Sequence, residues 1–297
     1  MHHADMKILL FGGSGRIGTT MQRLWKNHHM IAPSRAEVDV SDGMAIEKAL
    51  EQYRPELVIN LVAYNNVDKA EQDDRDLAFT LNFGLPTRLA TITASHNLPF
   101  FHFSTDYVFE GNKPEGYTEM DTPSPISIYG ESKHLGEAGA LRENPRTYII
   151  RTSRVYGPNA MSANAKRTFI ELILDDATQM QTVPVNPIEV SAPTYGDDLV
   201  RQIEQHLFSF PEPGIYHLAN QEGGTWMEWA QEIVKHLDIP VTIVPRDLST
   251  LIRAAKRPQH SILINTKLPP MRPWQEALQE FLATKPWPFN PVWQPSK

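Results

Sequence analysis

The sequence has 297 residues and contains no cysteine. This absence excludes disulfide bonds, thiolate catalysis and cysteine-ligated zinc, and it is typical of proteins that stay in the reducing cytoplasm. The 11 histidines are scattered, and none forms the H-x-x-x-H or H-E-x-x-H pair that binds a metal from one helix face. We therefore expect a cytoplasmic protein without a metal site.

Long hydrophobic runs and an excess of basic charge are also missing. No apolar stretch reaches the roughly 18 residues that a membrane-spanning helix needs. The first residues, 1–7, lack the basic-then-apolar order of a signal peptide. The formal net charge is −7, which disfavours binding to nucleic acid. We expect neither a membrane nor a nucleic acid as partner.

The first half of the chain alternates short apolar runs with amphipathic helical stretches. We predict strands at 7–11, 29–32, 57–63, 99–104 and 147–151. Predicted helices lie at 16–26, 44–53, 76–97 and 129–141, and the third of these could be broken at 84–86. Strands that are apolar throughout and alternate with helices indicate a parallel sheet covered on both faces. The fold class is therefore α/β, with a Rossmann-type doubly wound sheet.

After about residue 155 the pattern loosens and proline becomes frequent. Helices are predicted at 168–174, 197–208 and 225–237, and a capping box of Thr225 and Glu228 opens the last one. We expect a dinucleotide-binding domain over 6–157 and a smaller substrate lobe over 158–297. A segment near 186–220 should pack back on the first domain. The proline-rich tail, 285–297, is predicted to be an irregular surface segment.

A glycine-rich loop follows the first predicted strand. Gly12, Gly15 and Gly18 form G-x-x-G-x-x-G, in which the glycines permit a tight turn, a close approach to a pyrophosphate and close helix–strand packing. The helix that follows offers free N–H groups to phosphates. This context favours a dinucleotide site over an ordinary glycine-rich turn.

The residues after the second predicted strand bear on which dinucleotide binds. NAD-binding folds often place a carboxylate there for the ribose hydroxyls. Here Pro33, Ser34 and Arg35 follow the strand. Ser34 and Arg35 could accept a 2′-phosphate, although Arg35 could also be a solvated surface residue. We predict NADPH as cofactor, with NADH as the alternative.

Tyr129 and Lys133 lie four residues apart in a predicted helix, which places both side chains on one face. Reduction of a carbonyl by hydride leaves an alkoxide that must receive a proton. Tyrosine is a weak acid with a pKa near 10, and a nearby ammonium lowers that pKa. The same lysine could hydrogen-bond the ribose beside the nicotinamide. The spacing is close to what chance produces, so the position of the pair after the fourth strand carries the argument.

Thr105 closes the fourth predicted strand, at the edge of the sheet where ligands bind in doubly wound folds. Its hydroxyl could donate to a substrate carbonyl. It could equally satisfy backbone groups at the strand end.

The chain contains, in this order, the segments GGSGRIG (12–18), Asp39-Val40, INLVAYNNVDKAE (59–71), FSTDYVF (103–109), SPISIYGESK (124–133), RTSRVYG (151–157), GIYHLAN (214–220) and AKRPQHSILINT (255–266). This series resembles the dTDP-4-dehydrorhamnose reductases, which are extended short-chain dehydrogenases. The resemblance covers nearly the whole chain. It implies a Rossmann-type reductase with a smaller lobe that closes over a nucleotide sugar.

The resemblance also implies roles for individual residues. The catalytic set would be Thr105, Tyr129 and Lys133, with Tyr129 as proton donor. The implied cofactor contacts are Gly15, Arg16 and Ile17 at the pyrophosphate, Asp39 and Val40 at the adenine, and Ala63 and Tyr64 in the loop after the third strand. The implied sugar site comprises Asn65, Val67, Thr105 and Asp106.

Three departures from the family pattern lie on the substrate side. Arg154 stands where the family has a tryptophan that faces the sugar. The family's D-Q-x-G-x-P-T segment appears as NPIEVSAPT (186–194), and its N-S-R-L appears as HSIL (260–263), without the arginine. The resemblance therefore supports carbonyl reduction more strongly than any one sugar.

Three functions remain open at this point. The first is NADPH-dependent reduction of the 4-keto group of a nucleotide-linked 6-deoxysugar, with dTDP-4-dehydrorhamnose as substrate, in the synthesis of polysaccharide precursors. The second is a sibling reductase for another nucleotide sugar, because Arg154 could meet a carboxylate or an extra hydroxyl. The third is a non-catalytic subunit similar to the β subunit of methionine adenosyltransferase. A homodimer is compatible with each.

Overall fold

The computed structural model describes residues 5–162, 165–284 and 287. Its centre is a six-stranded sheet in the order β10-β5-β4-β3-β1-β2, in which every pairing is parallel. The strands are β1 (Lys7–Phe11), β2 (His29–Ile31), β3 (Leu57–Asn60), β4 (Phe100–Thr105), β5 (Thr147–Thr152) and β10 (Gly214–His217). The predicted Rossmann-type α/β fold is confirmed.

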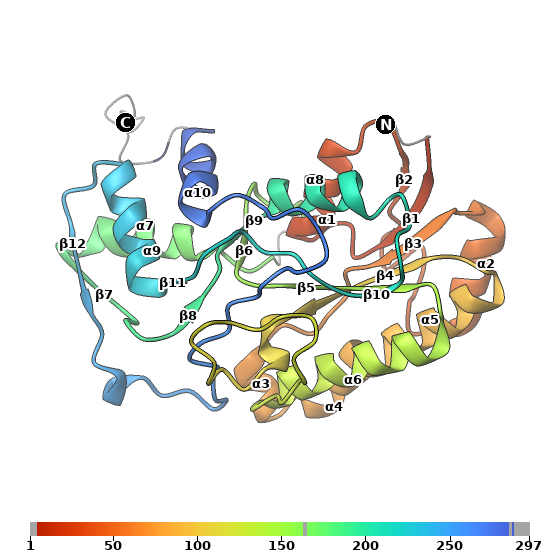
Figure 1. The fold of residues 1–297 in the computed structure, drawn as a ribbon, viewed down its shortest axis with the longest axis horizontal. Coiled ribbons are helices and arrows are strands. Elements are labelled where there is room, and N and C mark those ends of the chain that lie inside the picture. The colour runs from red at the N-terminus through yellow and green to blue at the C-terminus, as the bar shows by residue number, and fades with distance from the viewer. Residues whose placement is uncertain (1–4, 163–164, 285–286, 288–297) are drawn as a thin grey trace.

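Helices cover both faces of this sheet (Figure 1). On one face lie α1 (Arg16–Leu24) and α8 (Gly196–His206), and on the other lie α2 (Gly43–Tyr53), α5 (Leu85–Ser95) and α6 (Ile128–Glu143). Trp25, Phe101 and Ile203 belong to the hydrophobic core of the first face, and Ile46 and Leu89 belong to that of the second. Burial on both sides explains why the strands are apolar at nearly every position.

The chain runs without a break from α4 (Arg75–Phe79) through a π-helical turn (Thr80–Gly84) into α5. The break considered at 84–86 is therefore wrong. Pro86 lies in the first turn of α5, and the wider π turn before it avoids the clash that proline causes inside a regular helix. The π turn carries Asn82, whose side chain is buried.

Two elements of the central body come from late in the chain. β10 pairs with β5 at the edge of the sheet, and α8 packs on α1, where Trp25 Nε1 donates to the carbonyl of Val200 at 3.3 Å. The helix of α8 was predicted, whereas β10 was not. Its four residues, which begin at a glycine, are too few to show a period.

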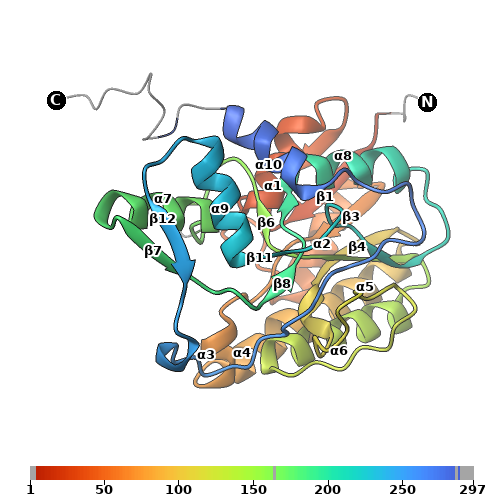
Figure 2. The ribbon, with the colours of Figure 1, turned by 60° about the vertical axis from the view of Figure 1, so that its left-hand side comes forward.

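The rest of the second half forms a smaller lobe at the end of the sheet (Figure 2). It contains α7 (Phe169–Gln179), α9 (Trp226–His236), α10 (Trp274–Ala283) and the parallel pair β7 (Thr182–Val185) and β12 (Thr242–Pro245). Trp229, Trp274 and Phe281 belong to its core. The predicted capping box of Thr225 and Glu228 is confirmed at the start of α9, and α10 was not predicted. The predicted irregular tail, 285–297, lies outside the described residues except for Trp287.

Short strands and a long connection join the lobe to the sheet. β6 (Val155–Tyr156) pairs with β9 (Thr194–Tyr195), and β8 (Val190–Ser191) pairs with β11 (Gly224–Thr225). Residues 253–268, which we call the strap, return from the lobe past α3 (Val67–Glu71) and across the front of the molecule (Figures 1 and 2). No helix in the described part of the chain is long and apolar enough to cross a membrane.

Candidate active site

The glycine loop lies between β1 and α1, as predicted. Gly12 has φ +83°, and a Cβ at Gly18 would lie 2.6 Å from the backbone of Gly13. Both positions therefore need glycine. Gly15 is the N-cap of α1, without a side-chain cap and without an acidic residue in the first turn. The loop and the helix N-terminus thus present backbone N–H groups and no competing carboxylate, which suits a pyrophosphate.

Arg16 and Ile17 begin α1. The Arg16 Nη1 donates to the carbonyls of Gly157 at 2.9 Å and Pro158 at 2.7 Å, so this side chain ties the glycine loop to the chain after β6. Burial lowers the pKa of Arg16, and Glu171 opposes that shift. Ile17 packs against the core of the first sheet face. A pyrophosphate could meet the backbone of both residues.

The exposed residues Ser34 and Arg35 follow β2. The carboxylate of Glu37 accepts a hydrogen bond from the backbone N of Ser34 at 2.7 Å. A carboxylate therefore does stand beside the end of β2, which the prediction from Pro33, Ser34 and Arg35 overlooked. The spacing Ser-x-x-Glu, which is typical of such a bond, was the available signal. Asp39 is exposed and accepts from the backbone N of Ser41 at 2.9 Å, and Val40 packs against the core of the second face.

The loop with Ala63 and Tyr64 follows β3 and is held by Asn82. Asn82 Oδ1 accepts from the backbone N of Tyr64 at 2.8 Å, and Nδ2 donates at 3.0 Å both to the carbonyl of Tyr64 and to Oγ of Ser132 in α6. Burial and a 2.5 Å hydrogen bond to Asp74 raise the pKa of Tyr64 to about 12. Asn82 thus links the predicted cofactor loop to the residue before Lys133. In the sequence, the only signal for Asn82 is that it is a polar residue inside the helix predicted over 76–97.

The structure brings Thr105, Tyr129 and Lys133 together at the carboxyl end of β4. Thr105 ends that strand, and α6 begins one residue before Tyr129 with a cap from Ser127. The phenol of Tyr129 lies close to the side chain of Thr105, which acts to lower its pKa. Oγ1 of Thr105 in turn donates to Oδ1 of Asp106 at 3.0 Å. Thr105 therefore lies beside both the phenol of Tyr129 and the buried carboxylate of Asp106.

The pKa of Tyr129 is raised, not lowered as the sequence suggested. Burial is the main cause, because a phenolate would lose its hydration; the side chain of Thr105 opposes the shift, and Asp106 adds to it. The Nζ of Lys133 donates to the carbonyl of Phe103 at 2.5 Å. Burial lowers the pKa of Lys133 to about 8, and Glu137 opposes this shift.

Asp106 lies at the centre of the site with 3% of its surface exposed. Oγ of Ser261, from the strap, donates to Oδ2 of Asp106 at 2.6 Å. Burial raises the pKa of Asp106, and the bonds from Ser261 and Thr105 and the charge of Arg154 oppose the shift. Ser261 was not among the predicted site residues.

Asn65 and Val67 lie at the start of α3. Asn65 is exposed, and its carbonyl accepts from Nζ of Lys166 at 2.8 Å. Val67 is the first residue of the helix and is partly buried. The next residue, Asp68, accepts from Arg257 of the strap at 2.7 Å. The predicted sugar site therefore lies where α3, β4 and the strap meet.

Arg154 lies where the sheet meets the smaller lobe, with φ +42°. It donates from Nη1 to the carbonyl of Gly224 at 3.0 Å and from Nη2 to that of Glu189 at 2.9 Å. Its guanidinium stacks on the indole of Trp226, 3.9 Å from the ring centroid. Burial lowers the pKa of Arg154 to about 10, with Asp106 the strongest opposing charge. One face of this cation is thus covered by an aromatic ring from α9.

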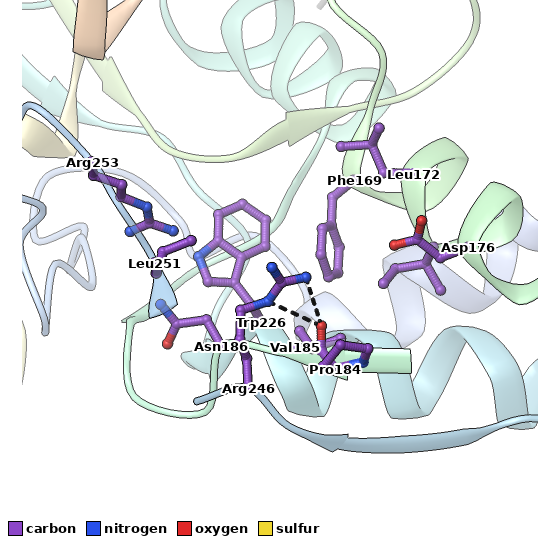
Figure 3. Close-up of a pocket in the computed structure, with 11 residues that line it drawn as sticks. Phe169, Leu172, Asp176, Pro184, Val185, Asn186, Trp226, Arg246, Leu251 and Arg253 are labelled. Atoms are coloured by element: carbon purple, nitrogen blue, oxygen red, sulfur yellow. Dashed lines mark hydrogen bonds between the residues drawn. The ribbon is translucent and has the colours of Figure 1, made fainter. Parts of the chain in front are cut away.

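Trp226 also borders a cavity of about 320 Å³ in the smaller lobe (Figure 3). The rings of Phe169 and Trp226 lie 4.6 Å apart beside the guanidinium of Arg246, which donates to the carbonyl of Pro184. Further lining residues are Leu172, Ile173, Asp176, Val185, Asn186, Leu251 and Arg253. Nε1 of Trp226 donates to Glu189 at 3.1 Å, and Arg253 pairs with the same carboxylate. Aromatic faces and two arginines therefore border one space, and sequence reasoning did not identify it.

Within the described residues, no group of three histidine, aspartate or glutamate side chains could hold a metal ion. The chemistry that these residues can perform is proton donation by Tyr129, assisted by Thr105, beside the buried cation of Lys133.

Comparison with known proteins points to one family. A family model described as RmlD substrate binding domain matches residues 6–286. A dTDP-4-dehydrorhamnose reductase from Streptomyces griseus is 32% identical, with 92% of this chain and 91% of the relative covered. A probable dTDP-4,6-dihydroxy-2-methyloxan-3-one 4-ketoreductase from Streptomyces antibioticus is also 32% identical, over 93% of this chain and 94% of the relative.

Among solved structures, the dTDP-4-dehydrorhamnose reductase from Bacillus anthracis in complex with NADP superposes with a TM-score of 0.88. It is 27% identical, and 95% of this chain and 100% of that one are covered. The resemblance found in the sequence is therefore confirmed: the chain belongs to the dTDP-4-dehydrorhamnose reductase family.

Proposed function

We propose that this protein reduces the 4-keto group of a nucleotide-linked 6-deoxysugar with NADPH, and that dTDP-4-dehydrorhamnose is the substrate. The product, dTDP-rhamnose, would serve as a precursor of surface polysaccharide. The observation that carries the proposal is that Tyr129, Thr105 and Asp106 lie together beside the buried Lys133.

The glycine loop supports a dinucleotide cofactor. The backbone at Gly12 and Gly18 leaves no room for side chains, and the first turn of α1 carries no carboxylate. The solved relative from B. anthracis contains NADP. Bound NADPH would supply the hydride. Ser34 and Arg35 would meet the 2′-phosphate, and Asp39 and Val40 the adenine, while Ala63 and Tyr64 would border the cofactor.

The residues of this chain would manage the proton. As negative charge develops on the carbonyl oxygen of the sugar, the hydroxyl of Tyr129 donates its proton there. The hydroxyl of Thr105, which donates to Asp106 without substrate, turns to donate a hydrogen bond to the same oxygen. Lys133 stabilises the resulting phenolate and orients the nicotinamide ribose. The raised pKa of Tyr129 keeps the phenol protonated until the alkoxide forms.

The nucleotide end of the substrate would lie in the cavity of the smaller lobe. Phe169 and Trp226 offer aromatic faces to a base, and Arg246 and Arg253 offer guanidinium groups to a diphosphate. Arg154 stacks on Trp226 and is also a charge near Asp106, so it joins this cavity to the sugar site bounded by Asn65, Val67 and Asp106.

The test is to follow the absorbance of reduced nicotinamide with purified protein, NADPH and dTDP-4-dehydrorhamnose. Tyr129→Phe should lower kcat by about 10²–10⁴-fold, the usual contribution of a general acid, and should leave NADPH binding unchanged. An inactive wild-type protein, or an unaffected Tyr129→Phe variant, would overturn the proposal.

Arg154 favours one second candidate, a sibling reductase for a different sugar. The relative from S. antibioticus is named as a 4-ketoreductase of another dTDP sugar. A panel of dTDP- and UDP-linked keto sugars distinguishes the two, because the better substrate has the higher kcat/KM. Cofactor binding without turnover on any of these sugars would instead indicate a regulatory subunit.

A further inference from the structure

A cluster of buried polar and charged side chains that includes Lys133 extends from α6 to β5 and β10. One turn further along α6 is Glu137, and the next members are Arg151 on β5 and His217 on β10. The exposed fractions are 2% for Lys133, 1% for Glu137, and 0% for Arg151 and His217. No step of the proposed reaction uses Glu137, Arg151 or His217.

Glu137 and Arg151 form a bidentate ion pair. Nε and Nη2 of Arg151 donate to the two carboxylate oxygens at 2.8 and 2.7 Å. The guanidinium also lies over the ring of Phe109, 5.0 Å from its centroid. The carboxylate is therefore fixed in one orientation, four residues from Lys133 on the same helix face.

His217 does not add a charge to this cluster. Its Nδ1 lies 3.0 Å from the carbonyl of Tyr117 and 3.2 Å from that of Ile264, so this nitrogen must carry a hydrogen. Its Nε2 faces Nη1 of Arg151, a donor, at 3.3 Å, so this nitrogen must be the acceptor. Burial, as the main cause, lowers the pKa of His217 to about 4, which agrees with a neutral ring.

The cluster thus holds two cations, Lys133 and Arg151, and one carboxylate, Glu137, which pairs with Arg151 and lies one helical turn from Lys133. A buried ammonium without a counter-charge releases its proton, because burial disfavours the charged form. We infer that Glu137 is a positioning residue that keeps Lys133 charged for catalysis, and that Arg151 limits how strongly it does so. The catalytic part of this inference rests on the proposed function.

Other titratable groups also face the cluster. From β4, His102 is fully buried and its pKa is well below the usual value, so it is neutral. Tyr129 lies on α6, and Glu119 contacts the backbone of His217 at 3.2 Å. His134 is the partly exposed member, with Nδ1 3.7 Å from Glu137. His134→Gln replaces this ring with a neutral amide and is the matched control.

The test is the titration of Lys133 itself, followed by NMR of the intact protein labelled with ¹³C-lysine. Lys133→Arg assigns the resonance. Glu137→Gln should move the midpoint to lower pH, and Arg151→Gln should move it to higher pH, each by about one unit or more. If Lys133 acts in turnover as proposed, the alkaline limb of kcat follows these shifts. His134→Gln should move neither.

A different result is expected if the ion pair of Glu137 and Arg151 only stabilises the fold. Both single variants would then lose stability, and the Lys133 midpoint would stay in place or move in the same direction in both. Either result overturns the inference. If a single variant does not fold, the double variant Glu137→Gln/Arg151→Gln removes both charges and leaves no unpaired ion. The midpoint of Lys133 in the double variant should lie below the wild-type value but closer to it than in Glu137→Gln, because Glu137 is the charge that acts on Lys133 and the opposing cation is lost with it. An unmoved midpoint also overturns the inference.

The NMR result does not depend on turnover. Opposite midpoint shifts in a wild-type protein that reduces no keto sugar would reject the proposed function and retain the charge coupling. If the enzyme reduces the keto sugar but the Lys133 midpoint does not move in the variants, the charge coupling is rejected and the proposed function is retained.

Discussion

Arg154 connects the catalytic residues to the cavity of the smaller lobe. Its two donors are bonded to the carbonyls of Gly224 and Glu189, and its flat face is stacked on Trp226. The charge nevertheless acts on Asp106. A single residue therefore fixes the aromatic wall of the cavity and influences the carboxylate beside Thr105. We expect its loss to affect the substrate more than the cofactor.

We predict that Arg154→Met raises KM for the keto sugar about five- to thirty-fold and leaves NADPH affinity within two-fold, because about 1–2 kcal/mol of charge and hydrogen bonding is removed from one wall of the site. Steady-state kinetics and NADPH fluorescence titration measure the two effects. Arg154→Lys keeps the charge without the planar stack, so it should recover only part of the loss. Equal changes for both ligands would contradict this role.

We expect the preference for NADPH over NADH to depend on three residues after β2, namely Ser34, Arg35 and Glu37. An exposed arginine attracts a 2′-phosphate and a nearby carboxylate repels it. Arg35→Ala should weaken NADPH binding about five-fold, as expected for ~1 kcal/mol at an exposed site, and Glu37→Gln should strengthen it. NADH binding should change little in both variants, since it lacks the phosphate. Titration of each variant with both dinucleotides decides the matter, and parallel changes for NADH would refute the assignment.

At the scale of elements, the start of α9 positions the cavity wall. Thr225 and Glu228 form the capping box that begins the helix, and Trp226 is the first helical residue. The cap therefore sets the height of the indole in the cavity. The π turn has a similar effect on the other side of the site, because it places Asn82 between Tyr64 and Ser132.

Thr225→Ala should lower the free energy of unfolding by about 1 kcal/mol, the usual cost of losing an N-cap, and should also raise KM for the nucleotide sugar. Chemical denaturation and kinetics report the two quantities. Thr225→Ser retains the hydroxyl and is the matched control. A lower stability with an unchanged KM would mean that the cap does not set the position of Trp226.

At the scale of the molecule, the strap and β10 join the two halves of the chain. The strap brings Ser261 to Asp106 and Arg257 to Asp68, and β10 brings His217 to Arg151. The site is therefore assembled from residues far apart in the sequence. The free energy of unfolding should therefore depend on the charged groups that are buried where these elements meet.

The pH dependence of unfolding should reveal the buried charges. The folded pKa of His217 is about 4, below its ordinary 6.5, so the unfolded chain binds the proton first and stability falls as the pH drops from 6.5 to 4. The pKa of Glu137 is about 2 in the folded protein against an ordinary 4.5, so a second loss follows between pH 4.5 and 2.

Urea denaturation across this pH range should show both losses. His217→Gln should reduce the first loss, to which the buried neutral His102 also contributes, and should keep the second. A free energy of unfolding that is flat from pH 6.5 to 4 in the wild-type protein would contradict the buried neutral state of His217.

The central sheet could be predicted because its signals are local. The apolar runs of β1, β3 and β4, the glycines after β1 and the four-residue spacing of Tyr129 and Lys133 depend on neighbouring residues only. The shorter β10 and the helix α10 carry weaker local patterns, and they are held in place by β5 and by the core of the smaller lobe.

The sequence by itself determined the Rossmann-type sheet, the glycine loop and the family. The tertiary structure decided the electrostatics: that burial raises the pKa of Tyr129, that Arg154 stacks on Trp226, and that Glu137 pairs with Arg151 and opposes the lowered pKa of Lys133. The physical reason is that a backbone pattern repeats over neighbouring residues. The charge state of a side chain, in contrast, depends on burial and on partners that the fold brings from distant positions.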